Sequence, residues 1–284
     1  MNISLTNNKF LIIFDFDDTL IDQTTFTNLF KKYYSPQQIK DLFSKIKNNI
    51  SWIELYRDCI KELKRQNLNI NDIKKEIEQI KLIEGYQEVF NTIRNNMDKF
   101  ICVIISGGNQ LMIKWLTDLY NISDLIYKVF AVNSFEDEDH IIKFKDINKH
   151  NCDNCNITQC KKNDLELLID EFKLKEKGMK ESNADNSGNV SNKGNESNKE
   201  NKEYKENTNW FSKILYVGDG INDYCPAKIL KKTDYLYVRK GYGLNKLIDS
   251  HEKYKNKLVC NINYWENGHD VNNYLLSFVL KPKF

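Results

Sequence analysis

Three short runs of apolar residues, each ended abruptly by polar residues or glycines, divide the chain. They read FLIIF at 10–14, ICVII at 101–105 and ILYV at 214–217, and they lead into DFDDTL, SGGN and GDGIND. Short, continuous apolar runs rich in β-branched residues are typical of strands buried on both faces of a parallel sheet. Val129–Asn133 and Tyr235–Val238 are two further strand candidates.

Helical periodicity separates these strand candidates. Gln110–Tyr120 and Leu165–Phe172 carry apolar residues at the spacing of a helix face. Strands that alternate with helices predict an α/β fold with a Rossmann-like, doubly wound parallel sheet. In such sheets ligands bind beyond the carboxyl ends of the strands, where all three polar clusters lie. We therefore expect one functional site built from these clusters.

The segment between the first two strand candidates has a different pattern. Stretches such as SWIELYRDCIKELKRQ place apolar residues at helical spacing, with Lys and Glu between them. This pattern predicts a small, all-helical module inserted into the α/β fold, positioned as a cap over the strand ends. The expected domains are a core of residues 1–22 and 84–284 and a helical cap of residues 23–83.

Residues 178–209 have an unusual composition. The segment reads GMKESNADNSGNVSNKGNESNKENKEYKENTN, which is almost entirely Asn, Lys, Glu, Ser and Gly. Because it holds almost no apolar side chains to bury, it cannot offset the entropy lost on ordering. We expect a disordered surface insertion in the core, serving either as a docking tail or as a tolerated loop expansion.

Overall charge and composition exclude several classes of function. The formal net charge is +2 in 284 residues, which argues against a general nucleic-acid or anionic-membrane binder. Apolar runs stop far short of the roughly 20 residues that cross a bilayer. The N-terminus lacks the basic start of a signal peptide. With seven cysteines, an odd number, we expect reduced thiols in a cytoplasmic protein with no membrane or nucleic-acid partner.

Carboxylates dominate the polar clusters. Asp15 and Asp17 stand two residues apart after the first strand, and Asp219 follows a later one. Close carboxylates repel each other unless a proton or a cation lies between them, and hard oxygen donors suit Mg²⁺. Ser106 and Gly107 offer a hydroxyl and an unobstructed backbone amide, which suit a phosphoryl group at a helix start.

In this order, DFDDTL, SGGN, a following lysine and GDGIND resemble the four motifs of the haloacid dehalogenase superfamily of aspartyl-nucleophile phosphatases. The resemblance implies a Rossmann-like core with a C1-type helical cap. It makes Asp15 the nucleophile that forms an aspartyl-phosphate, and Asp17 the general acid and base. It assigns Mg²⁺ to Asp15, Asp219 and Asp17, the last through its main-chain carbonyl.

The same resemblance assigns the binding of phosphate and substrate. Ser106 and Lys161 bind the phosphate, with Gly107 and Asn109 beside them. Asn222 and Asp223 support the site, Asp223 by orienting either the water on the metal or the lysine. The substrate implied is a small-molecule phosphomonoester.

A narrower resemblance concerns the second half of the chain. HNCDNCNITQCKK and VRKGYGLNKLI resemble the branch of phosphatases that act on phosphoethanolamine, phosphocholine or pyridoxal phosphate. In that branch the cysteine-rich block leads directly to the phosphate-binding lysine, which places this role on Lys161. Lys162 and Lys213 are weaker candidates for the same role.

Two positions depart from that branch and bear on the substrate. Acids in the branch occupy the places where this chain has Gly107 and Phe26, and without them a cationic head group loses its charge complement. Phe26, with Trp52 and Tyr56 from the predicted cap, suits a flat aromatic body. We therefore expect pyridoxal phosphate or another ring-bearing monoester such as thiamine phosphate. Phosphoethanolamine, phosphocholine and phosphoserine stay open as substrates, as does phosphomutase chemistry.

The cysteine-rich block raises a separate question. His150, Cys152, Cys155 and Cys160 have ligand types and spacing that could close a zinc site, or they are free thiols near the lysine. A zinc-binding interaction module is the rival function of another class. Cys225 is expected to shape a turn. The RKGY segment at 239–242 either borders the phosphate pocket or forms a solvated loop.

Overall fold

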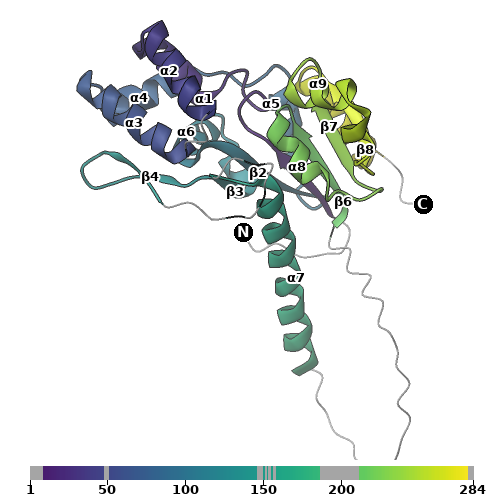
Figure 1. Cartoon of the computed structure of the whole chain (residues 1–284). Helices are drawn as coiled ribbons and strands as arrows, with labels where there is room; N and C mark the ends of the chain where they lie inside the picture. Colours follow the sequence, from purple (N-terminus) through teal and green to yellow (C-terminus); the bar gives the residue numbers. More distant parts are fainter. Residues whose placement is uncertain are drawn as a thin grey trace, which may run out of the picture.

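The fold is described from a computed structural model of the chain (Figure 1). The description covers residues 9–47, 51–145, 150, 152, 155, 158–185 and 211–280. Within these residues a six-stranded parallel sheet has the order β3-β2-β1-β6-β7-β8. Its strands are β1 (Lys9–Phe14), β2 (Phe100–Asn109), β3 (Ile126–Val132), β6 (Phe211–Gly218), β7 (Tyr235–Arg239) and β8 (Asn261–Trp265).

The strand order indicates where a ligand site is expected. From β1 the chain builds outward through β2 and β3, and it then crosses to β6 on the other side of β1. Ligands in such sheets bind where the order of strands reverses. Asp15 and Asp219 follow the two strands at this point, and β1 pairs with β6 from Lys9 to Phe14. The predicted meeting of the polar clusters is therefore built into the topology.

Helices cover both faces of the sheet because β1 is apolar on both. Leu11 and Ile13 pack with α7 (Lys161–Asp185), α8 (Tyr224–Ala227) and α9 (Gly243–Ser250). Ile12 and Phe14 pack on the opposite face with α5 (Tyr86–Arg94), α6 (Gln110–Leu119) and α11 (Gly268–Val279). A short helix, α10 (Glu252–Lys255), follows α9, and the 3₁₀ turns are η1 (Ser123–Leu125) and η2 (Ile221–Asp223). The doubly wound α/β prediction is confirmed.

The predicted cap is helical. It contains α1 (Thr25–Tyr33), α2 (Pro36–Lys47), α3 (Trp52–Arg65) and α4 (Ile70–Ile77), which lie together at one end of the molecule (Figure 1). A hairpin that the sequence did not predict, β4 (Ser134–Glu136) with β5 (Ile142–Phe144), lies beside α3. There Tyr56 stacks on Phe144 with 5.6 Å between ring centroids. The hairpin follows the edge strand β3, so it links the cap to that edge of the sheet.

Helix α7 corrects part of the predicted insertion. The expected disordered segment began at Gly178, but α7 continues to Asp185 (Figure 1). The Lys, Glu, Met and Ala residues of this stretch are good helix formers, so one glycine does not end the helix. Residues 186–209 of the predicted insertion lie outside the described residues. Among the described helices, even α7, the longest, lacks the apolar character needed to cross a bilayer.

Candidate active site

Three buried side chains form the centre of the site. The Nζ atom of Lys161 lies 2.6 Å from Oδ2 of Asp15 and 2.7 Å from Oδ1 of Asp223. Asp15 follows β1, Lys161 begins α7 and Asp223 ends the η2 turn after β6, so three separate segments supply them. Both carboxylates raise the pKa of Lys161 above its ordinary value against the effect of its burial. The ammonium is therefore held charged beside Asp15.

Asp223 also folds its own loop. Its Oδ1 accepts a hydrogen bond from the Tyr216 hydroxyl (2.8 Å), and its Oδ2 accepts from the backbone N–H groups of Asp219 (3.1 Å) and Gly220 (2.9 Å). A Cβ atom on Gly218 would lie 2.5 Å from the same carboxylate, which explains the glycine there. One aspartate thus holds Lys161 and shapes the turn that presents Asp219.

A carboxylate cluster lies at the mouth of β1 and β6. Asp15, Asp219 and Asp223 each place an oxygen within 4.8 Å of the others. Asp219 Oδ1 accepts from the Thr19 hydroxyl at 2.9 Å. Burial, reinforced by the neighbouring carboxylates, raises the pKa of Asp219 to about 9. Burial raises the pKa of Asp15 to about 7, although Lys161 opposes this shift.

These donors fit Mg²⁺ chemically. They are hard oxygen atoms, and the raised pKa values of Asp15 and Asp219 indicate that negative charge is poorly compensated there, a condition that a divalent cation relieves. The Asp17 side chain is not part of the cluster. Asp17 was expected to bind the metal through its main-chain carbonyl, so its carboxylate remains available for a role other than metal binding.

The Asp17 carboxylate faces the first turn of α1. Its Oδ1 accepts from the backbone N–H of Thr25 at 3.0 Å and its Oδ2 from the Thr25 hydroxyl at 3.3 Å. Burial raises the pKa of Asp17 to about 6, and the hydrogen bonds from Thr25 limit the rise. A carboxyl group that titrates near neutral pH suits general acid and base catalysis.

The SGG segment ends β2 beside Asp17. Ser106 is buried, and its Oγ accepts from the backbone N–H of Gly108 at 3.1 Å. A Cβ atom on Gly108 would lie 3.3 Å from both Asp17 Oδ2 and Ser106 Oγ, so the backbone approaches the acids closely. At Gly107 an added Cβ would meet nothing closer than 3.9 Å, so this position has open space in front of it.

Asn109 has a different role from the one predicted. It was expected to contact phosphate or substrate, but its side chain is completely buried. Its Oδ1 caps α6 by accepting from the backbone N–H groups of Leu111 (3.0 Å) and Met112 (3.2 Å), and the Ser134 hydroxyl donates to it at 2.5 Å. Asparagine is favoured at this position because its oxygen satisfies free N–H groups of the first turn.

A cavity of about 310 Å³ contains the remaining predicted residues. Core acids form one side and cap residues the other. Its lining consists of Asp15, Asp17, Asp18, Thr24, Phe26, Thr27, Trp52, Tyr56, Ser106, Gly107, Gly108, Asp219, Gly220 and Asn222. A second pocket of about 210 Å³ shares Trp52, Gly107 and Asn222 with it and also reaches Lys161.

The cap side of the cavity is aromatic. The Phe26 ring packs edge-on against Tyr56, with centroids 4.8 Å apart, and against Trp52 at 5.6 Å. All three line the cavity, so they pack against each other and also face its interior. These rings therefore belong to the packed cap and also form one wall of the cavity.

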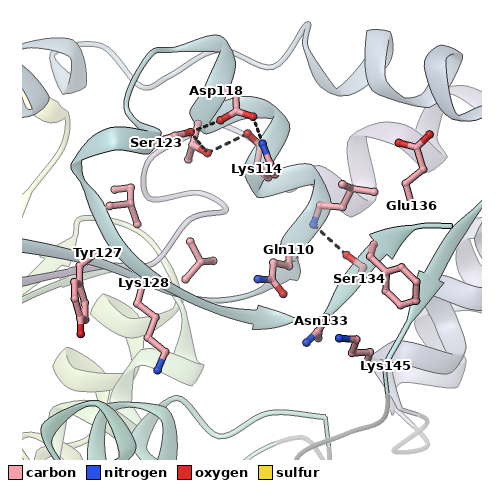
Figure 2. A pocket seen from close by; sticks show the side chains of 15 residues that line it. Gln110, Lys114, Asp118, Ser123, Tyr127, Lys128, Asn133, Ser134, Glu136 and Lys145 are labelled. Atoms are coloured by element: carbon pink, nitrogen blue, oxygen red, sulfur yellow. Dashed lines mark hydrogen bonds and ion pairs between the residues drawn. The ribbon is translucent and has the colours of Figure 1, made fainter. Parts of the chain in front are cut away.

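A larger groove, about 640 Å³, lies elsewhere, along α6 and the edge strand β3 (Figure 2). None of the sequence-motif acids lines it. Lys114 pairs with Asp118 at its border, so these charges compensate each other. The smaller cavity is the better candidate because it alone of the two brings carboxylates, a buried serine and glycine backbone together.

The position of Lys161 distinguishes it from Lys162 and Lys213, the two other candidates for the phosphate-binding lysine. Lys162 is more exposed and lies 3.4 Å from Glu166 along the same helix. The Lys213 ammonium donates to the Thr233 carbonyl oxygen at 3.2 Å, near the start of β6 and away from its carboxyl end. Of these three lysines, Lys161 is the one that contacts the site carboxylates.

Comparisons with known proteins show the family of the chain. The family model described as "Putative Phosphatase" matches residues 10–183 and 192–279. The chain belongs to this phosphatase family. The pyridoxal phosphate phosphatase PHOSPHO2 of Homo sapiens is 26% identical over 276 residues, covering 96% of this chain and 99% of that protein. The phosphoethanolamine/phosphocholine phosphatase of Gallus gallus is 24% identical, covering 96% of this chain and 90% of its own length.

Solved structures show the fold independently. A substrate-bound phosphoserine phosphatase matches with a TM-score of 0.54 at 16% identity, covering 95% of this chain and 99% of its own. Together with the family match, this makes the chain a phosphatase of the haloacid dehalogenase superfamily, a hydrolase of phosphoric monoesters. The resemblance drawn from the four motifs is confirmed.

Arg239 of this phosphatase has a role that the sequence did not indicate. It neither borders the phosphate pocket nor lies in a solvated loop. The guanidinium is buried, and it donates to the Asp18 carbonyl oxygen (2.7 Å) and to Asp22 Oδ1 (2.9 Å). It also lies over the Tyr242 ring at 4.1 Å. Arg239 thus anchors the loop that carries Asp15 and Asp17, whereas Lys240 beside it is exposed.

The cysteine cluster of the phosphatase also differs from the predicted set. Cys152, Cys155, Cys160 and Cys225 place their sulfurs within 4.8 Å of one another, and His150 is not among them. The His150 Nδ1 instead accepts from the backbone N–H of Cys152 at 3.2 Å. Cys225, expected only to shape a turn, therefore takes the predicted place of the histidine.

Three hydroxyl residues that contact the site acids, Thr19, Thr25 and Tyr216, were not predicted. Isolated hydroxyl residues give no sequence signal.

Proposed function

We propose that this phosphatase hydrolyses a small phosphomonoester in two steps, with Asp15 as the nucleophile. The observation that carries the proposal is the buried Asp15 carboxylate at the cavity, held 2.6 Å from the Lys161 ammonium. Splitting a difficult displacement through a covalent carboxylate intermediate is an established catalytic strategy. The catalytic core is residues 1–22 and 84–284, with residues 23–83 as its cap.

In the first step an Asp15 oxygen attacks the phosphorus atom, and the bond from phosphorus to the substrate oxygen breaks. Asp17 donates its proton to the leaving oxygen, so the alcohol departs neutral. In the second step Asp17 takes a proton from water as the water oxygen attacks the phosphorus of the Asp15 acyl phosphate. Inorganic phosphate leaves and Asp15 is restored. A pKa of about 6 for Asp17 suits both proton transfers.

The phosphoryl group is bound by charge and by hydrogen bonds. Lys161 offers an ammonium beside the nucleophile, and Ser106 and Gly107 line the cavity at the end of β2. Gly107 also lines the second pocket together with Lys161. Such preorganised donors stabilise the charge that develops on transferred phosphoryl oxygens. Asp223 keeps Lys161 in place, and Asn222 lies on the cavity wall.

Mg²⁺ would be held by Asp15 and Asp219 with the Asp17 carbonyl. When bound, it neutralises the repulsion between the phosphate and the nucleophile carboxylate. The buried, closely spaced carboxylates with raised pKa values support this part of the proposal.

The substrate we propose is pyridoxal phosphate or another ring-bearing monoester. The aromatic wall formed by Phe26, Trp52 and Tyr56 suits a substrate with a flat ring. No acid stands at position 26 or 107 to pair with a cationic head group. The human relative is named for pyridoxal phosphate, which agrees with this preference. Phosphoethanolamine, phosphocholine and phosphoserine are the alternative substrates.

Phosphate release from a panel of esters tests the proposal. The panel contains pyridoxal phosphate, thiamine monophosphate, phosphoethanolamine, phosphocholine, phosphoserine and an aryl phosphate, each with and without Mg²⁺. We expect Mg²⁺-dependent release that is abolished in Asp15→Asn and retained in Asp98→Asn, an exposed aspartate outside the site. Release that survives Asp15→Asn would refute the nucleophile, and a preference for an amino alcohol ester would refute the substrate.

A further inference from the structure

Four cysteines meet on the side of α7 where the helix begins. We define Cys152, Cys155, Cys160 and Cys225 as the tetracysteine cluster, whose four sulfurs all lie within 4.8 Å of one another. The Cys225 sulfur lies 3.6 Å from that of Cys152 and 3.9 Å from that of Cys160. All four are free thiols, two of them buried and two partly exposed.

These distances match a known coordination geometry. Zinc binds thiolate sulfur at about 2.3 Å, which places neighbouring sulfurs of a tetrahedral site about 3.8 Å apart. The two separations of 3.6 and 3.9 Å in the cluster lie on either side of that value. A disulfide would need about 2.05 Å between sulfurs. The thiols are thus spaced for a shared ion, and four thiolates leave no position for substrate or water.

We propose that the tetracysteine cluster binds one structural Zn²⁺ ion as four thiolates. Tetrahedral sulfur sites select zinc or iron, and zinc is our choice because it closes such sites without redox chemistry. Each thiol that becomes a ligand releases one proton as its bond to the metal forms. His150 stays outside the set because neither of its ring nitrogens lies within 4.8 Å of all four sulfurs.

The proposed ion would lie between two chain segments that both contribute to the active site. Three ligands come from the segment before α7, and the fourth comes from α8, which follows the turn after β6. Cys160 directly precedes Lys161, and Cys225 stands two residues after Asp223. The ion would therefore join the two segments whose side chains form the 2.7 Å ion pair between Lys161 and Asp223. This makes zinc a positioning element for the phosphate-binding lysine, and it takes no part in the chemistry.

Metal analysis of the purified, untagged full chain tests the proposal. We expect about one zinc per chain in the wild type. Cys152→Ser and Cys225→Ser should each lower the zinc content at least tenfold. Cys260→Ser is the matched control, because Cys260 is a buried thiol outside the cluster, and it should keep its zinc. Asp15→Asn should also keep it, which separates the thiolate site from the carboxylate site.

Two further measurements on the wild type keep the test valid if a variant fails to fold. Replacement of the metal by Co²⁺ should give the visible absorption of a tetrahedral thiolate complex. Alkylation followed by peptide mapping should show the four cluster thiols protected until a chelator is added. Zinc far below one per chain with freely alkylated thiols would overturn the proposal. Iron in its place, or a disulfide within the cluster, would overturn it equally.

Discussion

Lys161 and Asp223 form a buried ion pair of 2.7 Å whose two partners are 62 residues apart in the chain. The pair joins the first residue of α7 to the turn after β6, and the lysine reaches Asp15 from that position. Removing one partner of a buried charge pair leaves the other charge without compensation, so we expect stability, and with it activity, to depend on this pair.

Lys161→Met should lower kcat/KM by about 100-fold or more, because preorganised charge beside the transferred phosphoryl group is lost. It should also lower the melting temperature of the metal-free protein, since two buried carboxylates lose their cation. Steady-state phosphate release and thermal unfolding measure the two effects. Lys162→Met, one residue further along α7 and more exposed, is the control and should leave both unchanged.

Mg²⁺ should stabilise the phosphatase more at alkaline than at acidic pH. The pKa values of about 7 for Asp15 and about 9 for Asp219 lie above those of the unfolded chain, so the metal-free folded state holds extra protons from mildly acidic pH upward. Its free energy of unfolding therefore falls as pH rises through this window. Mg²⁺ removes the penalty by taking the place of the protons.

Thermal unfolding with and without Mg²⁺, at about pH 5.5 and about pH 8, measures this difference. We expect the larger rise in melting temperature at the higher pH. Asp219→Asn should reduce the rise at both, because a neutral amide neither titrates nor attracts the cation. An equal rise in the wild type at the two pH values would contradict the carboxylate cluster as the metal site.

Asp17→Asn should affect substrates unequally. If Asp17 protonates the leaving oxygen, its loss matters most for alkyl phosphates, whose alcohols are poor leaving groups, and least for activated aryl phosphates. We expect a loss of about 100-fold or more for the alkyl esters. Asp18→Asn is a close control, because Asp18 also lines the cavity and asparagine tolerates its positive φ of 54°. Equal losses for both ester types would argue against the acid role.

Gly107→Asp should move the substrate preference toward cationic esters. An added Cβ atom at Gly107 displaces no neighbour, and Gly107 lines the cavity, so the new carboxylate would stand at the cavity wall. We expect the ratio of kcat/KM for phosphoethanolamine over pyridoxal phosphate to rise about tenfold, equivalent to about 1.4 kcal/mol. Gly107→Asn tests size without charge. Phe26→Asp added to Gly107→Asp should extend the shift, but Phe26 packs in the cap, so the single variant is the cleaner experiment.

The sequence predicted the centre of the sheet well, for a physical reason. β1, β2 and β6 are covered on both faces, so their residues must be apolar without interruption, and such runs are easily recognised. β8, which reads NINYW, is an edge strand with mostly exposed or partly exposed residues and carries no such run. The hairpin strands β4 and β5 have three residues each, too few to show a period.

Site residues that directly follow those strands could be predicted from the sequence. Residues that reach the site only through contacts between distant segments could not. Asp15 and Asp219 stand at strand ends, so topology alone brings them together. Cys225 is 65 residues from Cys160, and no local spacing connects them. Sequence spacing favoured the nearby His150 as the fourth member of the cluster, whereas the fold places the sulfur of the distant Cys225 there. Arg239 likewise reaches Asp18 and Asp22 only after β7 is placed in the sheet.

Helix α7 has a consequence for how this chain can vary in length. It starts at Lys161 and runs for 25 residues, about 37 Å at the usual helical rise. The described chain resumes at Phe211, the first residue of β6, which lies at the opposite end of that strand from Asp219. The two positions that bound the intervening segment, the end of α7 and the start of β6, therefore lie away from the carboxylates. The protein can therefore lengthen or shorten there over generations while its catalytic geometry is preserved.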